Sequence, residues 1–136
     1  MKIIAVITFF LCAALPAFAD YVVIVNASNS STISMDDVKK IYLGKVTSFP
    51  GGSGAQPVML KERHPLREVF IEQVLGLPDS RYVALWAKML FTGNGEPPLE
   101  VDSLERIKDL VSREPAFIGF TDESLVDDSV RVIGRF

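Results

Sequence analysis

Segments typical of β-strands alternate with segments typical of α-helices along most of this chain. Short apolar runs, rich in β-branched and aromatic residues, predict strands at 21–25, 57–61, 116–120 and 130–133. Apolar residues at helical spacing predict helices at about 35–43, 65–75, 80–91 and 103–113. This alternation predicts a small, mostly parallel sheet with helices on its faces. The expected fold is therefore α/β, a single three-layer αβα domain.

The predicted helices have recognisable boundaries in the sequence. A residue that can accept a hydrogen bond from the first turn, followed three positions later by an acidic residue, is typical of a helix N-terminus. The candidate N-terminal capping residues are Ser34 with Asp37, Asp79 or Ser80, and Asp102 with Glu105. Pro65 suits the first position of the second helix, since that position needs no N–H donor. Gly44 and Gly76 mark the ends of the first two helices.

The first 19 residues differ in character from the rest of the chain. Lys2 precedes an apolar run from Ile3 to Leu15, and small residues at 17 and 19 come just before Asp20. This arrangement is typical of a cleaved secretory signal peptide. A membrane anchor is the alternative, but a helix over this run would reach only about 20 Å, against roughly 30 Å for a bilayer core. We therefore expect a signal peptide at 1–19 and a periplasmic domain at 20–136.

Composition excludes several classes of function. The chain has 136 residues, with 17 acidic and 14 basic side chains, one Cys and one His. A zinc site of four Cys and His ligands cannot be assembled from one of each, and an acidic balance does not favour nucleic-acid binding. Cys12 falls in the predicted signal peptide, so the mature protein would have no thiol. No second long apolar run follows, and we expect no membrane span, metal or cofactor in the mature protein.

No motif indicates an enzyme. The sequence lacks a G-x-S-x-G nucleophile motif, and its glycine clusters at 51–54 and 93–95 lack the spacing of phosphate-binding loops. His64 could act as a general base, but no Ser or Cys stands at a diagnostic spacing beside it. Tyr82 and Trp86 lie on the apolar stripe of a predicted helix, which favours core packing over stacking on a ligand.

One segment concentrates possible ligands for an anion. It runs from Lys61 to Arg67 and joins the end of a predicted strand to the start of a helix. Ligands of open α/β sheets bind beyond the carboxyl ends of strands, where helix N-termini present free N–H groups. Arg63, His64 and Arg67 could therefore surround an oxyanion. The alternative is a solvated turn whose charges, offset by Glu62 and Glu68, only keep this edge soluble.

The order of these segments also resembles a known family. Residues 33–45 (ISMDDVKKIYLGK), followed by Phe49, resemble the L-S-x-x-x-(V/L)-x-x-I-(F/Y)-x-G-K…W segment of phosphate-type substrate-binding proteins of ABC transporters. Residues 113–120 (REPAFIGF) resemble the P-G-A-I-G-Y strand entry of that family. Val69 and Phe70 stand where the family has its R-S-D-G-S-G-T-T-x-x-F anion loop. The resemblance covers Tyr21 to Phe120 and implies a type 2 periplasmic-binding-protein fold.

This chain departs from the family in two ways, in its number of lobes and in the residues of its anion loop. A full member has two α/β lobes of this size with the ligand between them, and this chain has residues for one lobe. Where the family's loop carries Ser, Gly and Thr donors, this chain has residues 62–67 (ERHPLR), and Pro65 supplies no N–H. Only the location of the loop carries over, with Arg63 and Arg67 as its charged partners.

Two hypotheses follow from the sequence. The first is a periplasmic, non-enzymatic, solute-binding-like protein that takes phosphate or another small oxyanion at Arg63, His64 and Arg67 for an ABC-type uptake system. A homodimer, an ABC permease or another envelope protein could close its half-open site. The second is an interaction or scaffold module that keeps the fold and has lost ligand binding.

Overall fold

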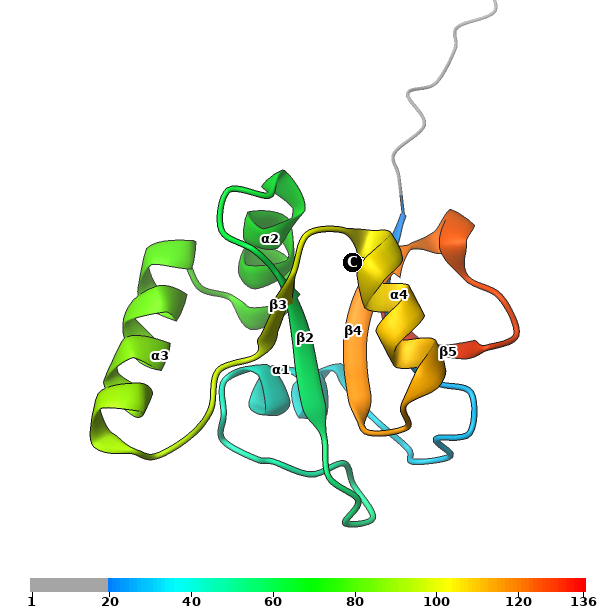
Figure 1. Ribbon diagram of the computed structural model, residues 1–136, viewed down its shortest axis with the longest axis horizontal. Coiled ribbons are helices and arrows are strands. Elements are labelled where there is room, and N and C mark those ends of the chain that lie inside the picture. Colours follow the sequence, from blue (N-terminus) through cyan, green and yellow to red (C-terminus); the bar gives the residue numbers. More distant parts are fainter. Residues whose placement is uncertain (1–19) are drawn as a thin grey trace, which may run out of the picture.

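The structure, a computed structural model, describes residues 20–136 (Figure 1). The strands are β1 (Tyr21–Asn26), β2 (Gln56–Leu60), β3 (Leu99–Val101), β4 (Phe117–Asp122) and β5 (Val130–Arg135). The α-helices are α1 (Met35–Tyr42), α2 (Pro65–Phe70), α3 (Asp79–Thr92) and α4 (Leu104–Arg113). A π-helical segment, η1 (Ile71–Leu75), continues α2, and a 3-10 turn, η2 (Glu123–Leu125), joins β4 to β5. The predicted signal peptide lies outside the described residues.

The strands form one mixed sheet in the order β3-β2-β4-β1-β5. β2 pairs in parallel with β3 and β4, whereas β1 pairs antiparallel with β4 and β5. Four strands thus run in one direction and β1 runs in the opposite direction. The sheet was expected to be mostly parallel, but both pairings of β1 are antiparallel, which is half of the four pairings in the sheet. The run from Val22 to Val25 is fully buried. A strand buried on both faces has the same continuous apolar pattern in either direction, so the direction of β1 could not be predicted from its residues.

Helices cover both faces of this sheet, which confirms the predicted three-layer αβα architecture (Figure 1). α4 packs on one face, mainly against β4 and β1, while α1 and α2 pack against β2 from the other side. α3 stands at the β3 edge of the sheet. α4 can approach closely because β4 carries Gly119: a Cβ at that position would lie 2.3 Å from Cγ2 of Ile107.

The capping box at the start of α1 is confirmed. The Asp37 N–H donates to Oγ of Ser34 at 3.1 Å, and the Ser34 N–H donates to Oδ2 of Asp37 at 2.8 Å. The Ser34 N–H, together with the Ser34 hydroxyl that donates to the same Oδ2 at 2.9 Å, lowers the pKa of the Asp37 carboxyl. The helix ends as predicted near Gly44, which has a left-handed φ of 71°. A Cβ at Gly44 would also collide with Met89 and Trp86. Glycine is therefore favoured at this position both by its backbone conformation and by the lack of space for a side chain.

The predicted caps of the two later helices are wrong. Ser103 rather than Asp102 caps α4, and its Oγ accepts from the Arg106 N–H at 3.1 Å. α3 begins after Pro78 without a side-chain cap, and the Asp79 carboxylate binds Arg67 instead. In both cases a more distant cation holds the acidic side chain, since Asp102 pairs with Lys61.

β3 is a strand that the sequence did not predict. It has three residues, follows Pro97 and Pro98, and pairs in parallel with β2 from Val58↔Leu99 to Leu60↔Val101. So short a segment has no measurable alternation, and two of its three side chains are exposed. The strand places Glu100 beside the end of β2, where its carboxylate binds Arg67.

An aromatic cluster fills the core beneath α2. The Phe70 and Phe120 rings stack with centroids 4.1 Å apart, and Tyr42 meets Phe70 edge-on at 4.7 Å. Phe136 closes the cluster, with its ring 5.4 Å from that of Phe70. The Tyr42 hydroxyl donates to the Val58 carbonyl at 2.7 Å, which joins α1 to β2. Within residues 20–136, no helix is both long and apolar enough to cross a membrane.

Candidate functional site

The predicted oxyanion ligands lie around the turn that joins β2 to α2. β2 ends at Leu60 and α2 begins at Pro65. The His64 N–H donates to the Lys61 carbonyl at 3.2 Å, which closes the turn. Arg63 has a φ of 74°, the one positive value of a non-glycine residue between 20 and 136. Such a backbone conformation is uncommon and is often found at functional sites.

His64 caps α2 through its ring. Nδ1 accepts a hydrogen bond from the Leu66 N–H at 3.2 Å, and the backbone of His64 is extended. When the imidazole is neutral, a ring that accepts at Nδ1 carries its proton on Nε2. His64 therefore keeps one N–H donor for a partner outside the helix. Arg63 is exposed beside it and has no carboxylate partner within the described residues.

Arg67 lies in a different environment from the other two predicted ligands. Its side chain is 5% exposed, and Nε binds Oδ1 of Asp79 while Nη1 binds Oε2 of Glu100, both at 3.0 Å. Nη1 also donates to the Leu60 carbonyl at 2.8 Å. The guanidinium carbon lies 5.7 Å from the centre of the Tyr82 ring. Arg67 thus joins α2 to β2, β3 and α3.

The structure therefore divides the three predicted residues. Arg63 and His64 stand together on the turn, and Arg67 lies inside, bonded to two carboxylates and a carbonyl. A second ion pair, Lys61 with Asp102 at 2.8 Å, ties the same turn to the segment before α4. The hydrogen bond to Asp102 raises the pKa of the Lys61 ammonium. Arg63 and His64 are thus the two predicted residues with donors that face outward.

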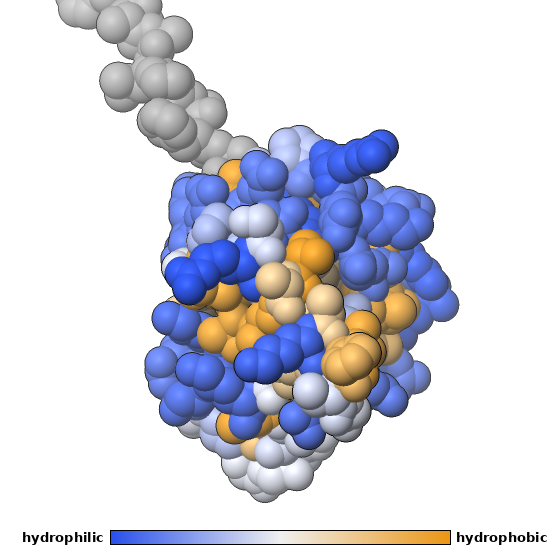
Figure 2. All heavy atoms as spheres, turned by 90° about the vertical axis from the view of Figure 1, so that its left-hand side faces the viewer, coloured by the Kyte–Doolittle hydropathy of each residue, from blue (hydrophilic) through white to orange (hydrophobic). Residues whose placement is uncertain are grey.

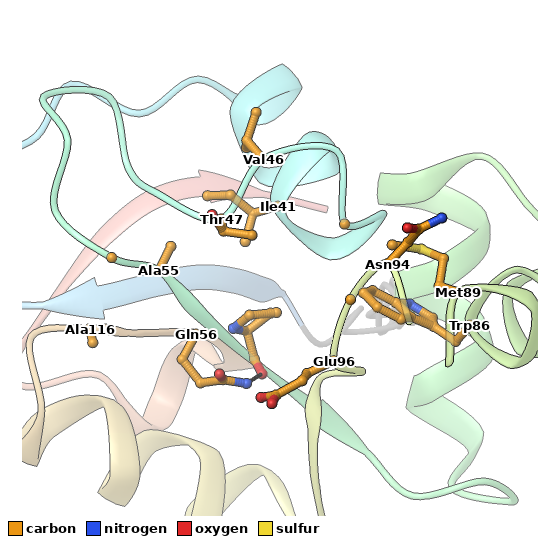
Figure 3. A pocket seen from close by; sticks show the side chains of 14 residues that line it. Ile41, Val46, Thr47, Ala55, Gln56, Trp86, Met89, Asn94, Glu96 and Ala116 are labelled. Atoms are coloured by element: carbon orange, nitrogen blue, oxygen red, sulfur yellow. Dashed lines mark hydrogen bonds between the residues drawn. The ribbon is translucent and has the colours of Figure 1, made fainter. Parts of the chain in front are cut away.

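Two hollows lie away from the turn, and a third, smaller one borders it at Glu62 and Arg67. One, of about 440 Å³, is bordered by the end of α1, the start of β2 and the loop after α3, and Trp86 and Met89 form one of its walls (Figure 3). A polar hollow of about 500 Å³ lies among Ser28–Ser31, Ser53 and Glu114. A smaller one of about 220 Å³ lies beside Arg67, between α3 and Pro97.

The sequence placed Trp86 and Tyr82 in the core, which the structure confirms, since they are 7% and 2% exposed. It did not show that Trp86 also lines the pocket of about 440 Å³. The available signal was the loop at 93–96, where two glycines follow the helix that carries Trp86. No group of three or more His, Cys, Asp or Glu side chains in residues 20–136 is placed to hold a metal ion.

Solved structures of phosphate-transport proteins share this architecture. A protein described as a phosphate ABC transporter substrate-binding protein from Clostridium perfringens, solved with bound phosphate, aligns with a TM-score of 0.66 and 23% identity, over 85% of this chain and 45% of its own. An ABC-type phosphate transport receptor from Vibrio cholerae aligns with a TM-score of 0.61 and 21% identity, over 85% and 46%. PstS from Borrelia burgdorferi aligns at 0.57 and 12% identity, over 86% and 48%.

The chain shares the fold of the aligned part of these phosphate-transport proteins. It spans about half the length of each of these structures. No protein-family model and no curated protein sequence matches it. At this level of identity the likeness concerns the fold alone.

Proposed function

We propose that this chain is an exported, single-lobe binding protein that takes phosphate or another small oxyanion at the turn between β2 and α2. The main supporting observation is the turn itself, which presents the exposed Arg63 and the half-buried His64 beyond the carboxyl end of β2. The fold likeness to a structure solved with bound phosphate agrees with this class of ligand. The proposed site stays at the turn predicted from the sequence, but Arg67 now positions the turn instead of contacting the anion.

In the proposed site, Arg63 and His64 contact the anion and Arg67 positions the turn. The Arg63 guanidinium can offer two parallel N–H donors to an oxyanion, and the Nε2–H of His64 can offer a third. The clamp of Arg67 on Asp79, Glu100 and Leu60 holds α2 against β2, and so fixes where these donors stand. Because the turn is open to water, charge interactions there are weak, and we expect a dissociation constant of roughly 1 mM.

The proposal includes export and delivery. The predicted signal peptide at 1–19 would direct the protein to the periplasm, and the fold likeness to proteins of ABC-type phosphate transport supports an ABC permease as the partner. If export occurs as proposed, the protein recovered from the periplasmic fraction begins at Asp20. Recovery of the uncleaved chain with the membrane fraction would contradict it.

Calorimetric titration with inorganic phosphate tests the binding step. We expect saturable binding to the wild-type protein, and a loss of at least about fivefold in affinity for Arg63→Ala, which removes a charge-assisted contact. Arg106→Ala is the matched control, because Arg106 is an exposed arginine of α4 that pairs with Asp109 and with no residue of the turn. Equal affinity of the two variants would place the binding elsewhere.

A second candidate function is an interaction module, and the surface of α3 favours it. Four large apolar side chains are exposed there and on the neighbouring β3: Phe91 at 94%, Leu90 at 54%, Leu99 at 43% and Val83 at 39%. Figure 2 shows apolar side chains gathered on this side of the molecule within a hydrophilic surround. Scattered apolar residues on a surface are ordinary, but a contiguous patch of this kind is typical of an interface.

We take a second copy of this chain as the occupant of that surface, because the pattern on α3 is self-complementary. The exposed residues Val83, Ala87 and Phe91 stand at intervals of four, so they share one face of the helix. A two-fold axis at Ala87 would set Phe91 of each copy against Val83 of the other, with the small Ala87 where the helices cross. The four large side chains expose roughly 400 Å², about half of what one partner buries in a standard interface.

A further inference from the structure

The pocket beside Trp86 lies at the opposite end of β2 from the oxyanion turn. Gln56 at the start of β2 lines it, while the turn follows Leu60, roughly 13 Å further along the strand. Its volume of about 440 Å³ falls within the range of sites for small organic ligands. Nothing in the proposed capture of an oxyanion uses this pocket.

Two glycines of the lining pack closely against Trp86 and Met89. A Cβ at Gly44 would lie 2.6 Å from Cε of Met89 and 2.8 Å from Cη2 of Trp86. A Cβ at Gly95 would lie 2.9 Å from Cε of Met89 and 3.4 Å from Cζ3 of Trp86. Neither position can therefore accept a larger side chain without moving this wall. The wall is apolar and polarisable, and suits the hydrocarbon part of a ligand.

The polar groups of the pocket define the charge of the ligand. Besides backbone atoms, they are the side chains of Thr47, Gln56, Asn94 and Glu96. Figure 3 shows Gln56 and Glu96 on one wall, with Thr47 and Ile41 across the opening. Glu96 is the only ionisable side chain among the lining residues, and it has no ion-pair partner in the described part of the chain. Glu96 is exposed to solvent, and as the single charged group of the lining it favours a cation over an anion.

We infer that this pocket binds a small organic ammonium ion with an apolar body. The ammonium would lie against Glu96 and donate to the side-chain oxygen of Gln56, which lies beside it in Figure 3. The apolar body would contact Trp86 and Met89, where the indole also attracts a nearby cation through its ring. A phosphate ion has the wrong sign for Glu96 and no apolar part for this wall, so the ligand differs in class from that of the turn.

Fluorescence provides a direct test, because Trp86 is the only tryptophan in the sequence. The probes are 2-phenylethylamine, which is a cation at neutral pH, its neutral analogue 2-phenylethanol, and the anion phenylacetate. We expect a saturable change in Trp86 emission with the amine, an affinity about fivefold lower for the alcohol, and no saturation with the anion. Absence of a saturable change with the amine at 10 mM, or tighter binding of the anion, would overturn the inference.

Two variants separate the charge from the cavity. Glu96→Gln should weaken binding of the amine by about fivefold and leave the alcohol unchanged. Glu105→Gln, which removes an exposed carboxylate on α4, is the matched control and should change neither. Ala55→Leu, which adds bulk at a lining position, should weaken amine and alcohol alike. If Glu96→Gln binds the amine as tightly as the wild type, or Ala55→Leu has no effect on either probe, the pocket is not the site.

Discussion

The Arg67 side chain joins four elements of this domain, α2, β2, β3 and α3. Replacing it by Met leaves the Asp79 and Glu100 carboxylates and the Leu60 carbonyl without their donors. Arg67 is buried, but the side chains of Asp79 and Glu100 are 22% and 45% exposed and can be hydrated once it is gone, so we expect Arg67→Met to lower the free energy of unfolding by about 2 kcal/mol. Urea denaturation followed by circular dichroism measures this.

The control for that prediction is Arg106→Met. Arg106 pairs with Asp109 one turn away, but its side chain is 55% exposed, so its loss should cost less than about 0.5 kcal/mol. A loss at Arg67 no larger than that at Arg106 would contradict the role assigned to the buried clamp.

Two buried tyrosines predict how stability depends on alkaline pH. Burial raises the pKa of the Tyr42 hydroxyl well above 10, and it raises that of Tyr82 in the same way. In the unfolded chain both hydroxyls lose their protons near pH 10, whereas in the folded chain they keep them. The folded state then binds more protons, so stability is complete below pH 10 and falls as the pH rises above it.

Thermal melts between pH 8 and pH 11 check this expectation. The midpoint should remain constant to about pH 9.5 and then fall, and the fall should be smaller in Tyr42→Phe, which has one buried hydroxyl fewer. That variant should also be less stable at neutral pH by about 1 kcal/mol, because the Val58 carbonyl loses its donor. An identical alkaline fall in the variant and the wild type would argue against the buried hydroxyl as its cause.

At the residue level, the sequence showed that three possible anion ligands gather near one turn, but it did not show which of them face water. The cluster of Arg63, His64 and Arg67 was visible because the three are close in sequence. The partners of Arg67 lie 12 and 33 positions further along the chain, and one stands on a strand that the sequence did not predict. Which arginine faces water and which faces carboxylates is therefore decided by tertiary contacts.

Among the elements, the packing of α4 on the sheet depends on a glycine of β4. In Gly119→Ala the new methyl group would overlap Ile107 and approach Val111, so α4 must shift away from the sheet. Overpacking of this kind costs about 1–3 kcal/mol, and urea denaturation should show a loss in that range. Gly54→Ala is the matched control, since nothing lies within 4 Å of its Cβ position. A loss in Gly119→Ala no larger than in the control would show that α4 is loosely packed.

Predictability also differed between the elements. The capping box of α1 and the glycine end of η1 were foreseen because the groups involved are neighbours in sequence. The caps of α3 and α4 were not, because Arg67 and Lys61 hold the acidic residues expected to cap them. The short β3 and the direction of β1 are likewise set by pairing with distant strands.

For the whole molecule, the exposed face of α3 predicts self-association. The wild-type protein should form a reversible dimer at concentrations of about 0.1 mM or above, as the modest apolar area of this face allows only a weak interface. Sedimentation equilibrium measures it, and Phe91→Ser should shift the protein to the monomer without loss of stability, since Phe91 is 94% exposed. A wild-type protein that stays monomeric at 1 mM would remove the second candidate function in this form.

For the molecule as a whole, we propose above all that the turn between β2 and α2 binds a small oxyanion. Titration of the isotopically labelled protein with inorganic phosphate, followed by amide chemical shifts, tests it most directly. We expect saturable shifts centred on residues 61–66, which need at least about fivefold more phosphate in Arg63→Ala and are unchanged in Arg106→Ala. Shifts centred instead on the polar loop at Ser28–Ser31, or none up to 20 mM phosphate at constant ionic strength, would contradict it.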